Sequence, residues 1–497
     1  MPERSRAFVL TLLELAVAAL AIWQILEVAT AMSARVSADW DLEWMEGATL
    51  LSALRVAQGL PIHGEPTVEY VPFIYPPGYA WLLAACSSVY PLGYSLGRAV
   101  SVVATLVASV ALLAGARAAG ARWGLALGCV GLFWGTWVDG GTFLDLVRTD
   151  SVSLALLASA LVVAALPSRA ATVIGGLLLA VAFTTKHHVA AFGFPIALGL
   201  WSRDGWRRAA MFAAASAGPA LGFVAWQQVA SEGWFLTWIL GVPSSHGLVG
   251  RRLLPNLDAL GRPQGAQWEL WSALPITTTL CVLAARRWAL RTYWLGVAIT
   301  ALVVASVMRG HVGGFLNVLI PCLWVQSLLP ALLARSAERA PLAHAALLAA
   351  VGAQLLFGRD ELRSYVPKDG DDTRHAAFVE ALRELPEPLW LPHAPWAAVQ
   401  AGKRPSVALI TLWDIDHPTS PARVGVRRIR DAVGEGHFAT IVLPAKDLGY
   451  GLAAAYARRR PLTAPSVRTV TGWNVEIRHV WTPRAADDPP ARRRAAD

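Results

Sequence analysis

Residues 39–47 of the chain read DWDLEWMEG and follow a long apolar run. Four of these nine residues are carboxylic acids, namely Asp39, Asp41, Glu43 and Glu46. A carboxylate at the mouth of a cavity can remove the proton from an incoming hydroxyl group. Acidic residues in the first turn of a helix also complement the helix dipole, and Asp41 is a suitable N-cap. The stretch therefore predicts either the acidic rim of a catalytic cavity or an ordinary helix start.

Further polar residues stand at the ends of later apolar runs, where ionisable side chains usually face a cavity and mark function. They are Arg148 and Asp150 in VDGGTFLDLVRTDS, Lys186, His187 and His188 in TTKHHVAAF, His246 in VPSSHG, and Arg309, His311 and Asn317 in MRGHVGGFLN. Arginine binds a phosphate through a bidentate fork and lysine as a point charge. A pocket with both carboxylates and cations predicts group transfer between a hydroxyl and an anionic leaving group.

Each of these groups also has a structural interpretation. Arg148 and Asp150 could form an ion pair only, and Lys186 could reach the lipid headgroups. The histidines could be polar residues that form hydrogen bonds. No metal-ligand spacing is present, and the four cysteines lie far apart. We therefore expect no metal ligands among these residues, and the sequence leaves open whether a divalent metal takes part.

The composition identifies the environment of these residues. Of the 497 residues, 55% are hydrophobic and only 15% are charged, whereas soluble proteins carry roughly 25% charged residues. The sequence therefore predicts a polytopic membrane protein. Its net charge of +9 fits basic cytoplasmic loops, so nucleic acid is not an expected partner.

Eleven apolar runs are candidate membrane spans: 7–30, 97–116, 123–138, 151–166, 170–185, 188–202, 208–230, 269–285, 292–308, 313–334 and 341–357. With a cytoplasmic N-terminus, the inner connections hold thirteen arginines and the short outer connections hold three cations. This asymmetry fits the positive-inside rule. It predicts that the apolar stretch 76–92 lies in the membrane interface and that the C-terminus is outside.

The remaining segments fall on the outer side in this topology. The first outer loop covers 31–96 and contains a surface-lying amphipathic helix at 43–58 and the interfacial helix at 76–92. Residues 1–358 form the predicted membrane domain, 359–482 a small extracytoplasmic α/β domain and 483–497 a disordered tail. Within the α/β domain, TRHAAFVEALREL reads as a helix, and PLWLP, PSVALI, FATIVLP and WNVEIRHVW read as strands.

Several of these blocks resemble the GT-C glycosyltransferases, which are integral-membrane enzymes that use lipid-linked sugars. The similarity is to the protein O-mannosyltransferase-like and aminoarabinose-transferase-like members. It rests on MEG leading into a helix that ends QGLPIHG, on YPPGY, and on Arg98 in LGRAVSVVATL. LVRTDSVSLALL, FTTKHHVAAF and GHVGGFLNVLIP resemble later blocks, so that the similarity covers residues 7 to about 335.

The resemblance implies a polyprenyl-phosphate sugar donor and an inverting transfer. The first-loop acid of the family falls on Glu46, or on Asp41 or Glu43. Many members place Asp directly before the Glu, where this chain has Met45. The resemblance therefore implies a base among these three carboxylates without deciding which one.

We therefore expect a glycosyltransferase of the bacterial inner (plasma) membrane with its active site on the extracytoplasmic face. Glu46 is the leading candidate base, and Asp41 and Glu43 assist. The candidate donor-binding residues are Arg148, Asp150, Lys186, His187, His311 and Asn317. The acceptor, whether lipid, polysaccharide or protein, stays open. The alternatives are a secondary transporter of a polar or anionic solute, and a non-catalytic membrane protein that binds polysaccharide or assembles a complex.

Overall fold

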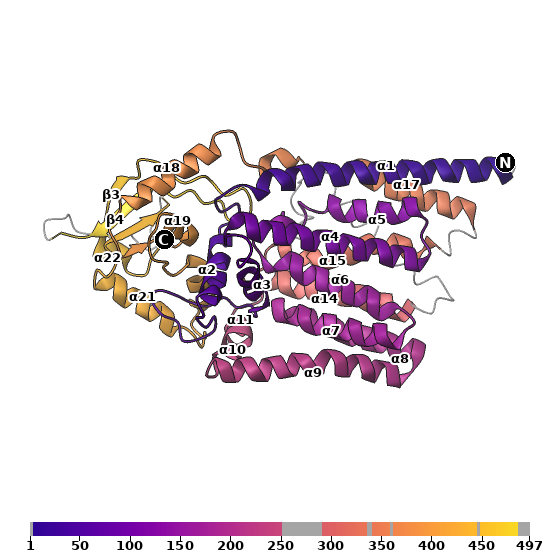
Figure 1. Cartoon of the computed structure of the whole chain (residues 1–497), viewed down its shortest axis with the longest axis horizontal. Coiled ribbons are helices and arrows are strands. Elements are labelled where there is room, and N and C mark those ends of the chain that lie inside the picture. Colours follow the sequence, from indigo (N-terminus) through magenta and orange to yellow (C-terminus); the bar gives the residue numbers. More distant parts are fainter. Residues whose placement is uncertain (1–2, 251–290, 335–339, 358–360, 445–447, 486–497) are drawn as a thin grey trace.

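The computed structural model describes residues 3–250, 291–334, 340–357, 361–444 and 448–485. Long helices that run side by side form a bundle, and a smaller part with a β-sheet lies at one end of it (Figure 1). The N-terminus lies at the opposite end of the bundle from the sheet. The smaller part, residues 361–485, is called the C-terminal segment below.

The bundle helices follow the apolar runs of the sequence closely. They are α1 (Glu3–Val36), α4 (Tyr94–Ala119), α5 (Trp123–Gly135), α6 (Thr149–Ala165), α7 (Arg169–Thr185), α8 (Gly193–Asp204), α9 (Trp206–Ala230), α14 (Arg291–Gly310), α15 (Ile320–Leu332) and α17 (Pro341–Phe357). Ten of the eleven predicted spans thus fall on helices. The predicted span at 269–285 lies outside the described residues.

Four of the described helices, α1, α4, α9 and α14, are long and apolar enough to cross a membrane. The others are shorter, as the sequence predicts, and short spans are tolerated where a helix end borders a polar cavity. Phe8, Leu15 and Leu26 of α1 are 64%, 61% and 59% exposed. Such apolar side chains on the outside of a bundle are expected where the solvent is lipid.

The connection between α1 and α4 carries two short helices, α2 (Glu46–Ala57) and α3 (Gly78–Cys86). Both were predicted from the sequence. Residues 46–53 of α2 are all buried, although a surface-lying helix should expose one face. The reason is that α3, α4 and, from the C-terminal segment, α19 (Pro395–Gln400) all pack on α2.

The C-terminal segment contains a four-stranded sheet with the order β1-β2-β4-β3. Its strands are β1 (Leu389–Trp390), β2 (Thr440–Leu443), β3 (Tyr456–Pro461) and β4 (His479–Pro483). β1 and β2 are parallel, whereas β4 is antiparallel to both β2 and β3. The helices of the segment are α18 (Asp371–Arg383), α19, α20 (Leu409–Ile415), α21 (Val424–Gly434) and α22 (Leu452–Ala455).

Successive side chains of β2 enter two different apolar cores, as a strand buried on both faces requires. Ile441 and Leu443 belong to the core formed with α20 and α21, and Val442 to the core formed with α18 and α19. The predicted helix at 373–385 and the strands in PLWLP and FATIVLP are confirmed. The predicted strand PSVALI is wrong, because its end starts α20, and only the last residues of WNVEIRHVW belong to β4.

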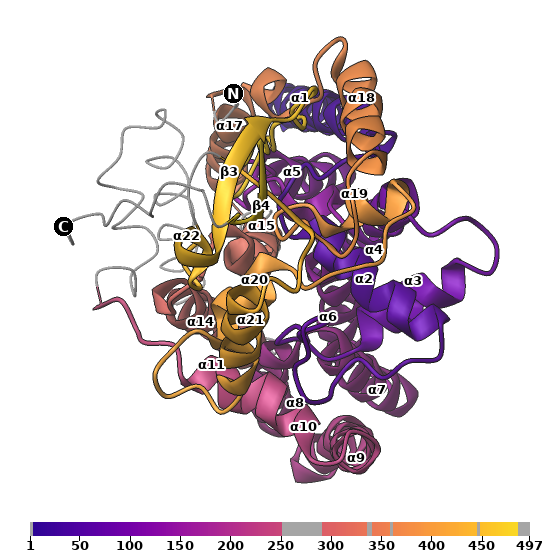
Figure 2. The same ribbon diagram turned by 90° about the vertical axis from the view of Figure 1, so that its left-hand side faces the viewer.

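The C-terminal segment is attached to the α1–α4 connection through its main chain. The amide nitrogens of Val470 and Thr471 both donate to the carbonyl oxygen of Leu42, at 2.9 and 3.2 Å. The hydroxyl of Thr471 donates to the carbonyl oxygen of Gly141 at 2.7 Å. Viewed along the bundle, the segment lies over the ends of the helices (Figure 2). Residues far apart in sequence can therefore line one site at this end.

Candidate active site

A cavity of about 690 Å³ lies where the bundle meets the C-terminal segment. Six of the nine predicted site residues line it: Glu43, Arg148, Lys186, His187, His311 and Asn317. The remaining three, Asp41, Glu46 and Asp150, are buried nearby but are not part of the lining. The sequence therefore identified most of the polar lining that the bundle provides.

The cations of the cavity stand at helix ends. Arg148 directly precedes α6, and Lys186 directly follows α7. The Lys186 Nζ donates to Asp150 Oδ1 at 2.6 Å, and Asn317 Nδ2 donates to the same oxygen at 2.9 Å. Asp150 thus positions both Lys186 and Asn317 at the edge of the cavity. The ion pair of Asp150 is with Lys186, and not with Arg148 as the sequence suggested.

Arg148 is buried, and two of its three guanidinium nitrogens, Nε and Nη1, have no hydrogen-bond partner among the described residues. The guanidinium carbon lies 5.8 Å from the ring centres of both Tyr75 and Phe143, which are aromatic faces that attract a cation. A buried guanidinium with free N–H groups is suited to bind an oxyanion.

Glu43 is the one first-loop carboxylate that lines the cavity. Its Oε2 accepts a hydrogen bond from the Met45 amide at 3.2 Å, and its Oε1 has no partner among the described residues. Burial raises the pKa of Glu43 to about 8, although the positive charge of Arg148 opposes this shift. A carboxylate with a pKa near the working pH is suited to general base catalysis.

Glu46, by contrast, is enclosed by donors. Its Oε1 accepts from Arg98 Nε at 3.0 Å and from the Val147 amide at 2.9 Å. Its Oε2 accepts from Arg98 Nη2 at 2.7 Å and from the Leu42 amide at 2.8 Å. Both Glu46 and Arg98 have fully buried side chains. Arg98 also donates to the main chain at Arg35, which ties the end of α1 to this pair.

Asp41 occupies a third environment. Its Oδ1 accepts a hydrogen bond from the Gly47 amide at 2.6 Å, within the first turn of α2. The residue that caps α2 is Met45, so the N-cap position predicted for Asp41 is wrong. Burial raises the pKa of Asp41 to about 7. Its side chain faces a small pocket shared with His375 and His393, away from the large cavity.

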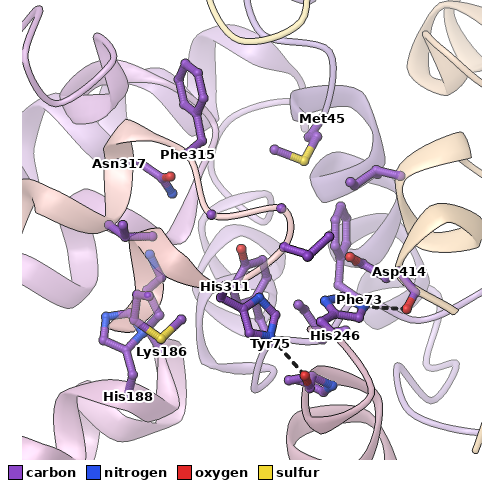
Figure 3. Close-up of a pocket in the computed structure, with 18 of the residues that line it drawn as sticks. Met45, Phe73, Tyr75, Lys186, His188, His246, His311, Phe315, Asn317 and Asp414 are labelled. Carbon is purple, nitrogen blue, oxygen red and sulfur yellow. Dashed lines mark hydrogen bonds between the residues drawn. The ribbon is translucent and has the colours of Figure 1, made fainter. Parts of the chain in front are cut away.

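The wall opposite the two cations comes from the C-terminal segment. Ile410, Trp413, Asp414, Gly472 and Trp473 all line the cavity. Figure 3 shows Lys186, His188 and Asn317 on one side and Asp414 on the other. Burial raises the pKa of Asp414 to about 8. None of these residues was predicted, because nothing in the local sequence distinguishes WDID from any other helix end.

Histidines bridge the two walls. His311 Nε2 bonds the carbonyl oxygen of Pro243 at 2.9 Å, and His246 Nε2 bonds the carbonyl oxygen of Asp414 at 2.7 Å (Figure 3). The His246 ring centre lies 4.9 Å from that of His311 and 4.4 Å from that of His417. Burial lowers the pKa of His246, which keeps the ring neutral near pH 7.

The described residues offer no ready set of ligands for a divalent metal. Within the described ranges, no three His, Cys, Asp or Glu side chains are grouped to hold a metal ion. The carboxylates of Asp41, Glu43 and Glu46 meet different partners instead of converging on one point.

Comparison with solved structures identifies the fold. The chain is similar to ArnT from Cupriavidus metallidurans, which has the GT-C fold, in its structure bound to undecaprenyl phosphate. The TM-score is 0.56 at 15% sequence identity, over 94% of this chain and 99% of ArnT. The apo structure of ArnT gives a TM-score of 0.55 at 14% identity, over 92% of this chain and 97% of ArnT.

The chain therefore has the GT-C fold that the sequence predicts, as an α-helical membrane protein with a small sheet region near its C-terminus. No protein-family model and no curated protein sequence matches it. The fold thus rests on structure, and the activity has to be argued from the cavity itself.

Proposed function

We propose that this chain is a membrane glycosyltransferase. It transfers a sugar from a polyprenyl-phosphate donor to an acceptor hydroxyl, with inversion, on the extracytoplasmic face of the bacterial plasma membrane. Its N-terminus is cytoplasmic, and the C-terminal segment is extracytoplasmic. The observation that carries the proposal is one cavity in which Arg148 and Lys186 face the carboxylates Glu43 and Asp414. ArnT, which shares the fold, has been solved with undecaprenyl phosphate bound.

Arg148 and Lys186 bind the donor phosphate in this proposal. The free N–H groups of Arg148 form a bidentate contact with phosphate oxygens. The ammonium of Lys186, held by Asp150, adds a point charge. These cations stabilise the negative charge that develops on the phosphate as it leaves. His187, His311 and Asn317 line the same space and complete the donor site.

Glu43 is the general base. It takes the proton from the acceptor hydroxyl while the acceptor oxygen forms a bond to the anomeric carbon of the sugar. The bond from that carbon to the phosphate oxygen breaks, and its electron pair leaves with polyprenyl phosphate. Attack opposite the leaving group inverts the anomeric centre.

Glu43 is preferred to Glu46, the leading candidate from sequence, on grounds of hydrogen bonding. A base needs an oxygen that can reach the reacting hydroxyl. Each oxygen of Glu46 already accepts two hydrogen bonds of 3.0 Å or less. Glu43 lines the cavity and has one oxygen without a partner among the described residues. In this proposal Glu46 and Asp41 have structural roles.

The test is the release of polyprenyl phosphate from a panel of polyprenyl-phosphate sugars by the full-length protein in lipid nanodiscs. We expect turnover by the wild type and its loss in Glu43→Gln, with binding of undecaprenyl phosphate retained. Lys368→Ala, which removes an exposed lysine of the C-terminal segment, is the matched control for Lys186→Ala in the binding assay. A wild-type protein that neither binds undecaprenyl phosphate nor turns over any donor would refute the proposal.

A further inference from the structure

The C-terminal segment contributes a wall with its own chemistry to the cavity. Trp413 and Trp473 are 37% and 54% exposed, and both line the cavity. Asp414 also lines the cavity, and only 5% of this residue is exposed. No hydrogen bond or ion pair to the Asp414 carboxylate is present within the described ranges. An unpartnered buried carboxylate beside accessible indole rings points to a ligand.

The positions of both indole rings are fixed by the rest of the site. A Cβ atom at Gly313, in the loop after α14, would lie 2.8 Å from two ring carbons of Trp413, so the ring rests directly on this glycine. The ring of Trp473 packs edge to face on Trp44 of the first connection, with ring centres 5.2 Å apart. These contacts join the C-terminal segment to the loop after α14 and to the α1–α4 connection, so the two rings are held before any ligand arrives.

We propose that Trp413, Asp414 and Trp473 form the acceptor site and that the acceptor is an uncharged carbohydrate. The assignment of this site to the acceptor rests on the proposed function. A sugar ring has apolar C–H faces that pack on flat aromatic rings, and hydroxyls around its edge that donate to a carboxylate. The wall formed by Trp413, Asp414 and Trp473 offers both kinds of contact in one place.

The charges of the cavity argue against an anionic acceptor. The cations among its described lining residues are Arg148 and Lys186, both on the bundle side. The C-terminal segment contributes no described arginine or lysine to the lining, but does contribute Asp414. A phosphorylated or acidic acceptor would therefore find no cation on this wall, and above about pH 8, where Asp414 is ionised, it would meet a carboxylate of the same charge, which disfavours binding in a buried site. A lipid chain would leave Asp414 buried without a partner.

The experiment measures binding of oligosaccharides to the full-length protein in nanodiscs by equilibrium dialysis without a donor, at pH 9, where Asp414 is ionised. The probes are uncharged cellopentaose, maltopentaose and mannopentaose, and the acidic pentamer of galacturonic acid. We expect at least one uncharged probe to bind and the acidic probe not to bind. Trp473→Ala is expected to weaken binding about 10-fold, the equivalent of roughly 1.4 kcal/mol. Trp201→Ala, which removes an indole of α8 that does not line the cavity, is the control and should change nothing.

Asp414→Asn removes the negative charge of this side chain and keeps its shape. It should weaken binding of the uncharged probe and allow the acidic pentamer to bind, because the repelling carboxylate is gone. Undecaprenyl-phosphate affinity should stay at the wild-type value in all these variants. If undecaprenyl phosphate binds but no uncharged probe does, or if the acidic pentamer binds the wild type more tightly, the acceptor proposal fails and the proposed function stands. If the lipid phosphate does not bind, the proposed function fails, and sugar binding still tests the wall independently.

Discussion

Glu43 and Glu46 stand three residues apart and each is associated with a buried arginine, yet their surroundings are opposite. The Glu46–Arg98 pair is closed, since both oxygens of Glu46 are occupied by direct donors at 3.0 Å or less. Glu43 and Arg148 share a cavity and retain free polar atoms. Burial and charge alone therefore do not identify a catalytic acid. What distinguishes the two is that Glu43 lines the cavity and keeps one oxygen without a hydrogen-bond partner among the described residues.

Replacing Glu43 should have the strongest effect on turnover. Replacing Glu43 with glutamine keeps its shape and removes the base, so turnover should fall roughly 10²- to 10⁴-fold. The affinity for undecaprenyl phosphate should be unchanged, because Arg148 and Lys186 are intact. Turnover is measured as polyprenyl phosphate released under saturating donor. Wild-type turnover in Glu43→Gln would transfer the role of base to Asp414, which Asp414→Asn then tests.

Replacing Glu46 should lower the stability of the protein. Glu46→Gln leaves the Arg98 guanidinium buried without its counter-charge, which typically costs about 3–5 kcal/mol of stability. Thermal unfolding in detergent should show a large drop in Tm for Glu46→Gln and a small change for Glu43→Gln. The double variant Glu46→Leu/Arg98→Met, which removes both charges, should recover part of the loss. A Glu46→Gln protein as stable as the wild type but inactive would instead place Glu46 in the chemistry.

Replacing Lys186 tests whether this lysine binds the donor phosphate. Lys186→Ala removes one charged contact to the donor phosphate, and a hydrogen bond to a charged group contributes about 1.5–3 kcal/mol. The affinity for undecaprenyl phosphate should therefore fall by at least about 10-fold. Lys368→Ala should retain wild-type affinity. Asp150→Asn should weaken binding less than Lys186→Ala, because it loosens the lysine without removing its charge.

The sequence was sufficient for the bundle and for one wall of the site. Apolar run lengths predicted ten described helices, and polar residues at helix ends such as Arg148, Lys186 and Asn317 proved to line the cavity. The sequence could not rank Glu43 above Glu46. The donors that enclose Glu46 are Arg98, 52 positions away, and the amide of Val147, 101 positions away. Such contacts leave no local pattern.

The C-terminal wall was missed for a related reason. PSVALI reads as a strand by composition, but Leu409 and Ile410 start α20, whose residues Trp413 and Asp414 face the cavity. Tertiary packing overrides β-propensity in such short segments. A second buried pair, Arg35 Nε with Asp145 Oδ2 at 2.9 Å, was also not foreseen as a contact. The residues were visible in the sequence, but their pairing depends on how α1 meets the connection before α6.

The pH dependence of stability should show a smaller effect, which tests whether burial raises the pKa of Glu43. Burial raises the pKa of Glu43 from 4.5 to about 8. Between these values the folded state holds a proton that the unfolded state has released. Stability therefore falls as pH rises through this window. Glu43→Gln cannot lose a proton, so its Tm should fall less than that of the wild type between pH 5 and pH 9.

The same carboxylate should make wild-type activity rise with pH toward about 8, because only the deprotonated form accepts the acceptor proton. Asp41 and Asp414 also have raised pKa values, so part of the stability change should persist in Glu43→Gln and diminish further in Glu43→Gln/Asp414→Asn. Identical pH profiles of Tm for wild type and Glu43→Gln would mean that Glu43 is as well solvated in the folded protein as in the unfolded chain. The difference from Glu46 would then lie in position alone, and the raised pKa would no longer support Glu43 as the base.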